Sequence, residues 1–154
     1  MGTEQKDELQ DSLQDYKGKI STSVKATLVW SRDLVFEGTT PRGYDLAFDA
    51  DSQWGCMPTE ALLLSLGGCM AIDIVSILKK MRMELKGLRV ELTAERNPEP
   101  PQYFRAVEMV LHLTGNNLDS RKIERAIALS REKYCSVYNT LRSDLVLTVR
   151  YTTG

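Results

Sequence analysis

The chain has 154 residues, of which 42% are hydrophobic and 27% are charged, and its formal net charge is -1. This length suits one domain with a hydrophobic core, and the balanced charge excludes the basic patch that nucleic-acid binding needs. The sequence does not begin with a basic segment followed by an apolar run, so we expect no signal peptide. We therefore expect a cytoplasmic protein that binds neither nucleic acid nor membranes.

The first part of the chain divides into a polar arm and a strand-rich segment. Residues 1–17 are acidic and polar, and we expect a solvated arm or a short amphipathic helix there, ahead of a single domain over 18–154. Alternating apolar residues predict three strands, at 21–30, 34–37 and 44–48. Because the turns between them are short and polar, the pattern indicates an antiparallel meander.

A long apolar helix is predicted over residues 58–83, PTEALLLSLGGCMAIDIVSILKKMRM. Pro58 and Glu60 are typical of a helix start, and basic residues close the segment. Its middle is apolar on every side of a helical wheel, which is typical of a buried helix. The uncharged run from Glu60 to Asp73 is about a dozen residues, short of the roughly 20 that a bilayer needs. Since one sheet covers only one face of a helix, we expect an obligate homodimer in which two sheets cover it.

The second half of the chain predicts further alternating strands and one more helix. These elements are strands at 88–94, 104–114 and 145–151, and a helix that Asp119 or Ser120 caps and that runs to about Tyr134. The whole order predicts an α+β fold with mainly antiparallel sheets around the long helix. The single histidine, His112, falls on the polar face of its strand, and no Ser or Asp beside it indicates a catalytic triad.

Three cysteines, Cys56, Cys69 and Cys135, are too few and too widely spaced for a disulfide framework. Without a CxxC pair, and with one histidine, the sequence predicts no structural zinc site and no cofactor. The thiols are therefore either inert and buried or reactive. Cys69 lies in the apolar helix, where burial raises a thiol pKa, so a nucleophilic role requires a nearby cation or hydrogen bonds to the sulfur.

Residues next to Cys69 allow two interpretations each. Gly67 and Gly68 either permit close packing of the helix or leave room for a substrate beside the sulfur. Asp73 lies one helical turn after Cys69 and either orients a cation or, as we favour, accepts a hydrogen bond from a neighbouring backbone group.

The strings PTEALLLSLGGC and EKYCSVYNTL resemble the OsmC/Ohr family, and AIDIVSILKKMR with LSREKYCSV is most similar to its YhfA-like branch. The resemblance extends from about Ser21 to the C-terminus. It implies an OsmC-like fold, an intertwined homodimer and a thiol-dependent peroxidase that reduces organic hydroperoxides. Cys69 would be the peroxidatic cysteine and Cys135 the resolving one. A dithiol reductant, a lipoylated protein in the better-known branches, would regenerate the pair.

The resemblance also implies an arginine–glutamate pair that activates the thiolate. Arg32 takes the arginine role by position, with Arg42 as a weaker match, and Glu60 takes the glutamate role. Alignment of the proline and the cysteine puts Thr59 where the organic hydroperoxide branch has its glutamate, and one residue is about 100° around a helix. Either Glu60 takes the role with adjusted geometry, or the arginine–glutamate pair is missing. Glu60 could instead be an acid favoured by the helix dipole. The alternative function is a non-catalytic OsmC-like protein that binds a small apolar ligand at the dimer interface.

Overall fold

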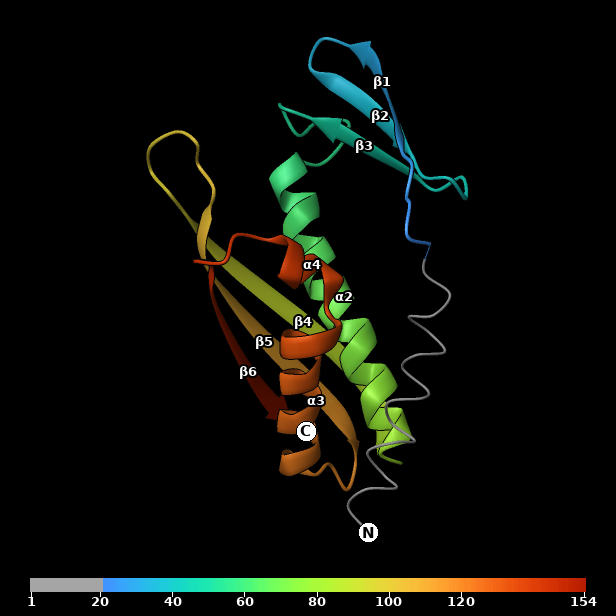
Figure 1. The fold of residues 1–154 in the computed structure, drawn as a ribbon, viewed down its shortest axis with the longest axis vertical. Coiled ribbons are helices and arrows are strands. Elements are labelled where there is room, and N and C mark those ends of the chain that lie inside the picture. Colours follow the sequence, from blue (N-terminus) through green and yellow to red (C-terminus); the bar gives the residue numbers. More distant parts are fainter. Residues whose placement is uncertain (1–20) are drawn as a thin grey trace. The chain divides into compact units, whose positions relative to one another are not determined.

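The computed structural model describes residues 21–154, so the predicted arm at 1–17 lies outside the described residues. The described residues belong to two compact units, 21–62 and 63–154. The boundary between the units falls inside helix α2 (Pro58–Lys80), the long helix that the sequence predicts (Figure 1).

The unit 21–62 contains the predicted three-stranded antiparallel sheet. Its strands, β1 (Thr27–Arg32), β2 (Val35–Thr39) and β3 (Asp45–Asp49), pair in that order. Large apolar side chains of this sheet remain open to solvent, with Leu28 57% and Trp30 65% exposed. A sheet with such an uncovered apolar surface is typical of a segment that packs against something else.

Strand β1 differs from the prediction at both ends. It begins at Thr27, and it continues through Arg32, which the sequence places in a turn. The reversal instead uses Asp33, whose φ of 42° lies in the left-handed region that aspartate tolerates. Arg32 is therefore a strand residue, paired in register with Val35.

Helix α2 begins at the predicted residue because its first turn is capped. The backbone N–H of Met57 donates to Oε2 of Glu60 at 2.8 Å, which is the glutamate half of a capping box. The other end is shorter than predicted: α2 stops at Lys80, and Arg82 turns the chain with a φ of 56°.

The unit 63–154 contains the rest of α2 and six further elements. In chain order these are β4 (Glu84–Arg96), β5 (Phe104–Asn116), α3 (Ser120–Leu129), the π-helical turn η1 (Ser130–Tyr134), α4 (Ser136–Thr140) and β6 (Val146–Thr153). The strands form one sheet in the order β4-β5-β6. β4 and β5 pair antiparallel as predicted, but β6 lies parallel to β5. The antiparallel prediction is wrong for this pair because the chain crosses over through helices, which return it in the same direction.

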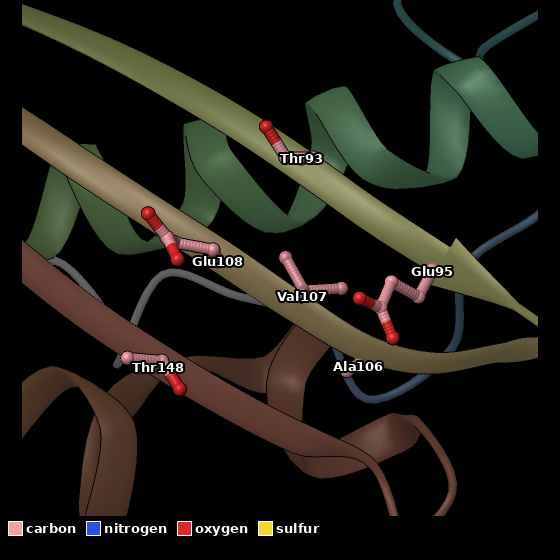
Figure 2. A pocket seen from close by; sticks show the side chains of 6 residues that line it. All are labelled: Thr93, Glu95, Ala106, Val107, Glu108 and Thr148. Carbon is pink, nitrogen blue, oxygen red and sulfur yellow. The ribbon is translucent and has the colours of Figure 1, made fainter.

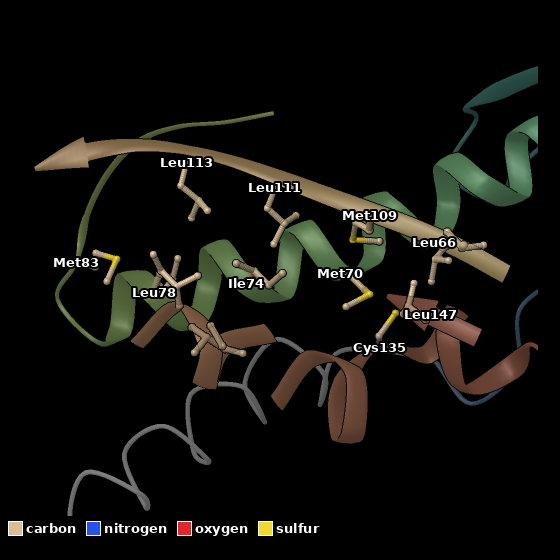
Figure 3. Packing of buried hydrophobic residues seen from close by; sticks show 14 of the residues in the cluster. Leu66, Met70, Ile74, Leu78, Met83, Met109, Leu111, Leu113, Cys135 and Leu147 are labelled. Atoms are coloured by element: carbon tan, nitrogen blue, oxygen red, sulfur yellow. The ribbon is translucent and has the colours of Figure 1, made fainter. Parts of the chain in front are cut away.

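The hydrophobic core of this unit lies between the sheet and helices α2 and α3 (Figure 3). Alternate residues of β5 face the helices, each at most 1% exposed: Val107, Met109, Leu111 and Leu113. Burial of these apolar surfaces is the main favourable contribution to folding. Gly67 allows α2 to approach the sheet, because a Cβ there would lie 2.6 Å from Cδ1 of Leu92.

Among residues 21–154, the opposite side of α2 carries exposed apolar side chains. Leu64 is 67% and Ile72 52% exposed, and a Cβ on Gly68, midway between them, would meet nothing within 4 Å. By length and mean hydropathy, 2.2 over its best 18-residue window, α2 could also span a membrane, and 39% of that window is buried in the structure. A partly buried core helix meets the same criteria. Within the part of the chain that the structure describes, the predicted burial of α2 on every side is therefore met on one side.

Candidate functional site

Three side chains of the unit 63–154 that can ligate a metal or react converge at the middle of α2. The Sγ atoms of Cys69 and Cys135 and a carboxylate oxygen of Asp73 all lie within 4.8 Å of one another. Cys69 and Asp73 are one helical turn apart on α2, so they share a face of the helix. The structure therefore brings together the two cysteines that the sequence analysis singled out, and adds a carboxylate to them.

The π-helical turn η1 supplies the other side of this cluster. Ser130, its first residue, donates a hydrogen bond from Oγ to Oδ2 of Asp73 at 3.0 Å. Cys135 follows η1, and its backbone N–H donates to the carbonyl of Ser130 at 2.7 Å, the i→i+5 bond of a π-helix. Single π-helical turns are frequent at functional sites because they change which residues share a face. Here the turn places Ser130 and Cys135 on the side that meets α2.

Ser130 is the site residue that sequence reasoning missed. It falls within the predicted second helix, and it is fully buried in the structure. For Asp73, the sequence analysis favoured a backbone donor, whereas the structure gives it the Ser130 hydroxyl. Asp73 and Ser130 are polar residues in otherwise apolar parts of two predicted helices. This is the sequence signal from which their contact could have been predicted.

Cys135 has the environment of an unreactive thiol. It is fully buried, beside Met70 and Leu147 (Figure 3). The pKa of the Cys135 thiol is raised from its ordinary 9.0 to about 12, chiefly by burial. The neighbouring Cys69 and the charge of Asp73 contribute to this rise, while the Tyr138 N–H bond to Sγ opposes it. That N–H lies 3.3 Å from the sulfur and makes Cys135 the cap of α4. At neutral pH this residue is therefore a thiol.

Cys69 is the more accessible of the two sulfurs. Its side chain is half-buried, whereas Cys135 is buried. The residue before it, Gly68, is exposed, with open space where a side chain would be. A molecule that approaches the cluster would therefore reach Cys69 first.

Arg32 and Glu60 each have a structural partner within the unit 21–62. The guanidinium of Arg32 lies 5.0 Å from the centroid of the Trp54 ring, a cation–π distance. The carboxylate of Glu60 accepts the Met57 N–H, so the helix-start interpretation of Glu60 is confirmed. Among the ion pairs of residues 21–154, none joins Arg32 to Glu60. Their catalytic roles stay predictions.

Cys56 is separate from the candidate site. It belongs to the unit 21–62, and its Sγ lies 3.7 Å from the carbonyl oxygen of Ala47. Its side chain is half-buried, and the cluster of metal-ligating groups does not include it. Cys56 is therefore a matched control for experiments on the other two thiols.

A second polar cluster occupies the outer face of the sheet. His112 Nε2 lies 2.8 Å from Oε2 of Glu91, and Nδ1 lies 2.9 Å from Oγ1 of Thr152. The sequence analysis found no triad-like neighbours for His112, because they come from other strands through the register of the sheet. The hydrogen bond from His112, and next the one from Arg89, lower the pKa of Glu91. Glu91 is half-exposed, so solvent screens this cluster.

The same outer face carries a shallow hollow of about 240 Å³ (Figure 2). It is lined by Thr93, Glu95, Ala106, Val107, Glu108 and Thr148. Glu108, one of these lining residues, forms an ion pair with Arg150 at 3.3 Å. The hollow is polar and lies across the sheet from the thiol cluster, so it does not provide an apolar pocket for Cys69.

The fold and the cluster define an α+β protein with two thiols at a common site. One thiol lies on the long helix α2, and the other directly follows the π-helical turn η1. The sequence profile described as OsmC-like protein matches residues 50–150. Protein YhfA of Escherichia coli K12 is 36% identical over 129 residues, which cover 83% of this chain and 96% of YhfA. The chain therefore belongs to the OsmC-like protein family. The segment 50–150 that matches the OsmC-like profile includes Cys69, Asp73 and Cys135, but Arg32 precedes it.

Solved structures agree with this assignment of the fold. A hypothetical protein from Aquifex aeolicus VF5 is 28% identical, with a TM-score of 0.79 over 87% of this chain and 98% of that chain. The organic hydroperoxide resistance protein OhrB of Bacillus subtilis is 16% identical, with a TM-score of 0.58 over 84% of this chain and 98% of OhrB. At that identity the likeness to OhrB concerns the fold alone.

Proposed function

We propose that this protein is a thiol-dependent peroxidase that reduces organic hydroperoxides, with a role in defence against oxidative stress. The observation that carries the proposal is the convergence of the Cys69 and Cys135 sulfurs to within 4.8 Å from two different elements. A disulfide needs an S–S distance of about 2.0 Å, so a small movement of the two side chains would join them.

In the proposed reaction, Cys69 is the peroxidatic residue, because it is the accessible one. Its thiolate attacks the distal oxygen of the hydroperoxide, the O–O bond breaks, and the alkoxide leaves and takes up a proton as the alcohol. Cys69 becomes a sulfenic acid. The sulfur of Cys135 then displaces water from it and forms the Cys69–Cys135 disulfide. A dithiol reductant returns both thiols and is itself oxidised to a disulfide.

This chemistry requires a thiolate at Cys69. A carboxylate near a sulfur disfavours a second negative charge, whereas a cation favours it. We propose that Arg32 supplies this cation, with Glu60 to position it. Arg32→Ala should then lower the rate of sulfenic acid formation, and Arg42→Ala, the control at the weaker match, should leave it unchanged.

We also propose that the active form is a homodimer. The apolar stripe of α2 made by Leu64 and Ile72, and the open apolar sheet of Leu28 and Trp30, are surfaces that a second copy of the chain would cover. Ile72→Asp should convert the dimer to a monomer in size-exclusion chromatography with light scattering. Val146→Asp, at a similarly exposed residue of β6, is the control and should remain dimeric.

The test of the peroxidase begins with the reduced, metal-free protein and one equivalent of cumene hydroperoxide. We expect a Cys69–Cys135 disulfide within seconds, mapped by mass spectrometry, and its loss in Cys69→Ser. Cys135→Ser should accumulate a sulfenic acid that dimedone traps, and Cys56→Ser should behave as the wild type. If both thiols survive excess hydroperoxide for minutes, the peroxidase proposal is wrong.

The second candidate is a non-catalytic protein that binds a small apolar ligand. The observation in its favour is that burial and the charge of Asp73 raise the pKa of Cys135, which favours inert thiols. The open space at Gly68 would then hold part of the ligand. This candidate predicts that the thiols resist cumene hydroperoxide. It also predicts that an apolar fluorescent probe binds the protein and that a bulky substitution at Gly68 prevents this binding.

A further inference from the structure

The Cys69–Asp73–Cys135 cluster has the donor set of a metal site, and we propose that in its reduced form it binds one Zn²⁺ ion per chain. The three donor atoms lie within 4.8 Å of one another, and two of the three residues are buried while Cys69 is half-buried. The proposal does not depend on peroxide turnover, because it concerns only the reduced thiols.

The chemistry of the donors selects the ion. Two thiolate sulfurs and one carboxylate oxygen suit Zn²⁺, which accepts sulfur and oxygen ligands, whereas Mg²⁺ and Ca²⁺ require oxygen ligands. Zn²⁺ replaces the two thiol protons, which pass to the buffer, and the carboxylate binds in its ionised form. The divalent charge then offsets two of the three negative charges that the ligands bring into an apolar region. Water would take the fourth tetrahedral position.

The arrangement of the chain also fits a metal site. Cys69 and Asp73 are at i and i+4 on α2, a spacing that points two ligands from one helix face to a common ion. Cys135 arrives from η1, so two separate elements hold the site. Oγ of Ser130 donates to Oδ2 of Asp73, a hydrogen bond of the kind that orients a ligating carboxylate.

The distances allow the site to close with little movement. Zn–S and Zn–O bonds of about 2.3 and 2.1 Å place tetrahedral donors roughly 3.5 to 3.8 Å apart. The donors here lie within 4.8 Å, so contraction of about 1 Å completes the geometry. The same two sulfurs cannot hold Zn²⁺ and form a disulfide together, so oxidation would release the ion.

The experiment is an anaerobic titration of the reduced full-length chain with Co²⁺ and then Zn²⁺. One equivalent of Co²⁺ should give a thiolate-to-cobalt charge-transfer band and the visible absorption of tetrahedral Co²⁺, and Zn²⁺ should remove both. Competition with a chromophoric chelator then gives the Zn²⁺ affinity. Bound Zn²⁺ should also slow alkylation of Cys69 by iodoacetamide.

Variants locate the ligands. Cys69→Ser and Cys135→Ser should each remove one thiolate contribution to the charge-transfer band and weaken Zn²⁺ binding by more than about 10-fold. Asp73→Asn should weaken Zn²⁺ binding by about 10-fold. Ser130→Ala keeps all three ligands and should weaken binding several-fold, so it tests the site if Asp73→Asn fails to fold. Cys56→Ser is the matched control and should bind as the wild type.

Two outcomes would overturn the proposal: Zn²⁺ bound no more tightly by the wild type than by the Cys69→Ser/Cys135→Ser double variant, or a cobalt spectrum lost in Cys56→Ser. No peroxide is present in this titration, and the peroxide test uses metal-free protein. Failure of one proposal is therefore distinguishable from failure of the other.

Discussion

The unit 63–154 holds two hydrogen-bonded polar clusters on opposite faces of one sheet, and they differ in burial. On the outer face, Glu91, His112 and Thr152 form a chain of carboxylate, imidazole and hydroxyl, the group types of a hydrolytic triad. On the inner side, Asp73 and Ser130 meet two thiols among apolar residues. The outer cluster has the more familiar chemistry, but solvent screens it.

The difference teaches that environment, more than residue type, decides which cluster can do chemistry. In a dry site each charge interacts more strongly, and an unmade hydrogen bond costs more free energy. Asp73 is 1% exposed, whereas the side chain of Glu91 is 51% exposed. We therefore expect substitutions on the inner side to change stability and reactivity, and those on the outer face to change little.

The largest expected effect compares two neighbours on β5. Leu111→Ala should lower the free energy of unfolding by about 2–5 kcal/mol, because Leu111 is fully buried against the helices. His112→Ala, the next residue, faces the outer cluster and should change it by about 0.5 kcal/mol or less. Urea denaturation followed by circular dichroism measures both. A loss at His112 as large as that at Leu111 would contradict the assignment of the faces.

The next effect compares the two hydroxyls. Ser130→Ala removes a buried donor to Asp73 and should cost about 1–3 kcal/mol of unfolding free energy. Thr152→Val is nearly isosteric, removes the hydroxyl partner of the half-buried His112, and should cost about 0.5 kcal/mol or less. Urea denaturation of both variants at the same ionic strength measures these two free-energy changes. Equal costs would show that burial does not distinguish the clusters.

A pH dependence should follow from Cys135. Its pKa is raised in the folded chain, from 9.0 to about 12, so the folded state holds the thiol proton longer than the unfolded state does. The stabilisation is complete below pH 9 and declines as the pH rises from about 9 toward 12. Between pH 8 and 10 the unfolding free energy should fall by roughly 1 kcal/mol from this group. Cys135→Ser should remove that part of the decline. If the stability of this variant had the same pH profile as the wild type, the raised pKa of Cys135 would be contradicted.

The smallest effect belongs to Glu91. Its pKa is lowered, chiefly by the hydrogen bond from His112, so its contribution to stability is present above its ordinary value of 4.5 and is lost as the pH falls through the lowered value. Glu91→Gln should therefore flatten the acid side of the stability curve slightly, and added salt should abolish the difference from the wild type. A difference that survives high salt would mean that this face is less accessible to solvent than the structure indicates.

Much of the fold could be predicted from the sequence, because its signals are local. The capped start at Pro58 and Glu60, the alternation along β5 and the Asp119 cap of α3 each depend on near neighbours, and the structure confirms them. The parallel pairing of β6 could not be predicted in this way. It depends on the packing of the crossover helix, which has no signature in the strand itself.

The site was predictable in part. Cys69 and Cys135 stood out by residue type and by resemblance, and the structure places them together. Ser130 did not stand out, because its partner Asp73 is far away in sequence and only packing of η1 on α2 brings them into contact. The outer cluster was missed for a related reason, since sheet register joins residues of three strands.

The π-helical turn has a consequence for how this family can vary. One extra residue in a helix rotates all later residues by about 100° around the helix axis. The π-helical turn η1 therefore changes the side on which Cys135 lies, relative to the face of α3 that packs on the core. Insertion and deletion there are thus not neutral changes of length. Relatives that lengthen or shorten this segment by one residue would keep both cysteines in their sequences and yet point the second sulfur away from the first.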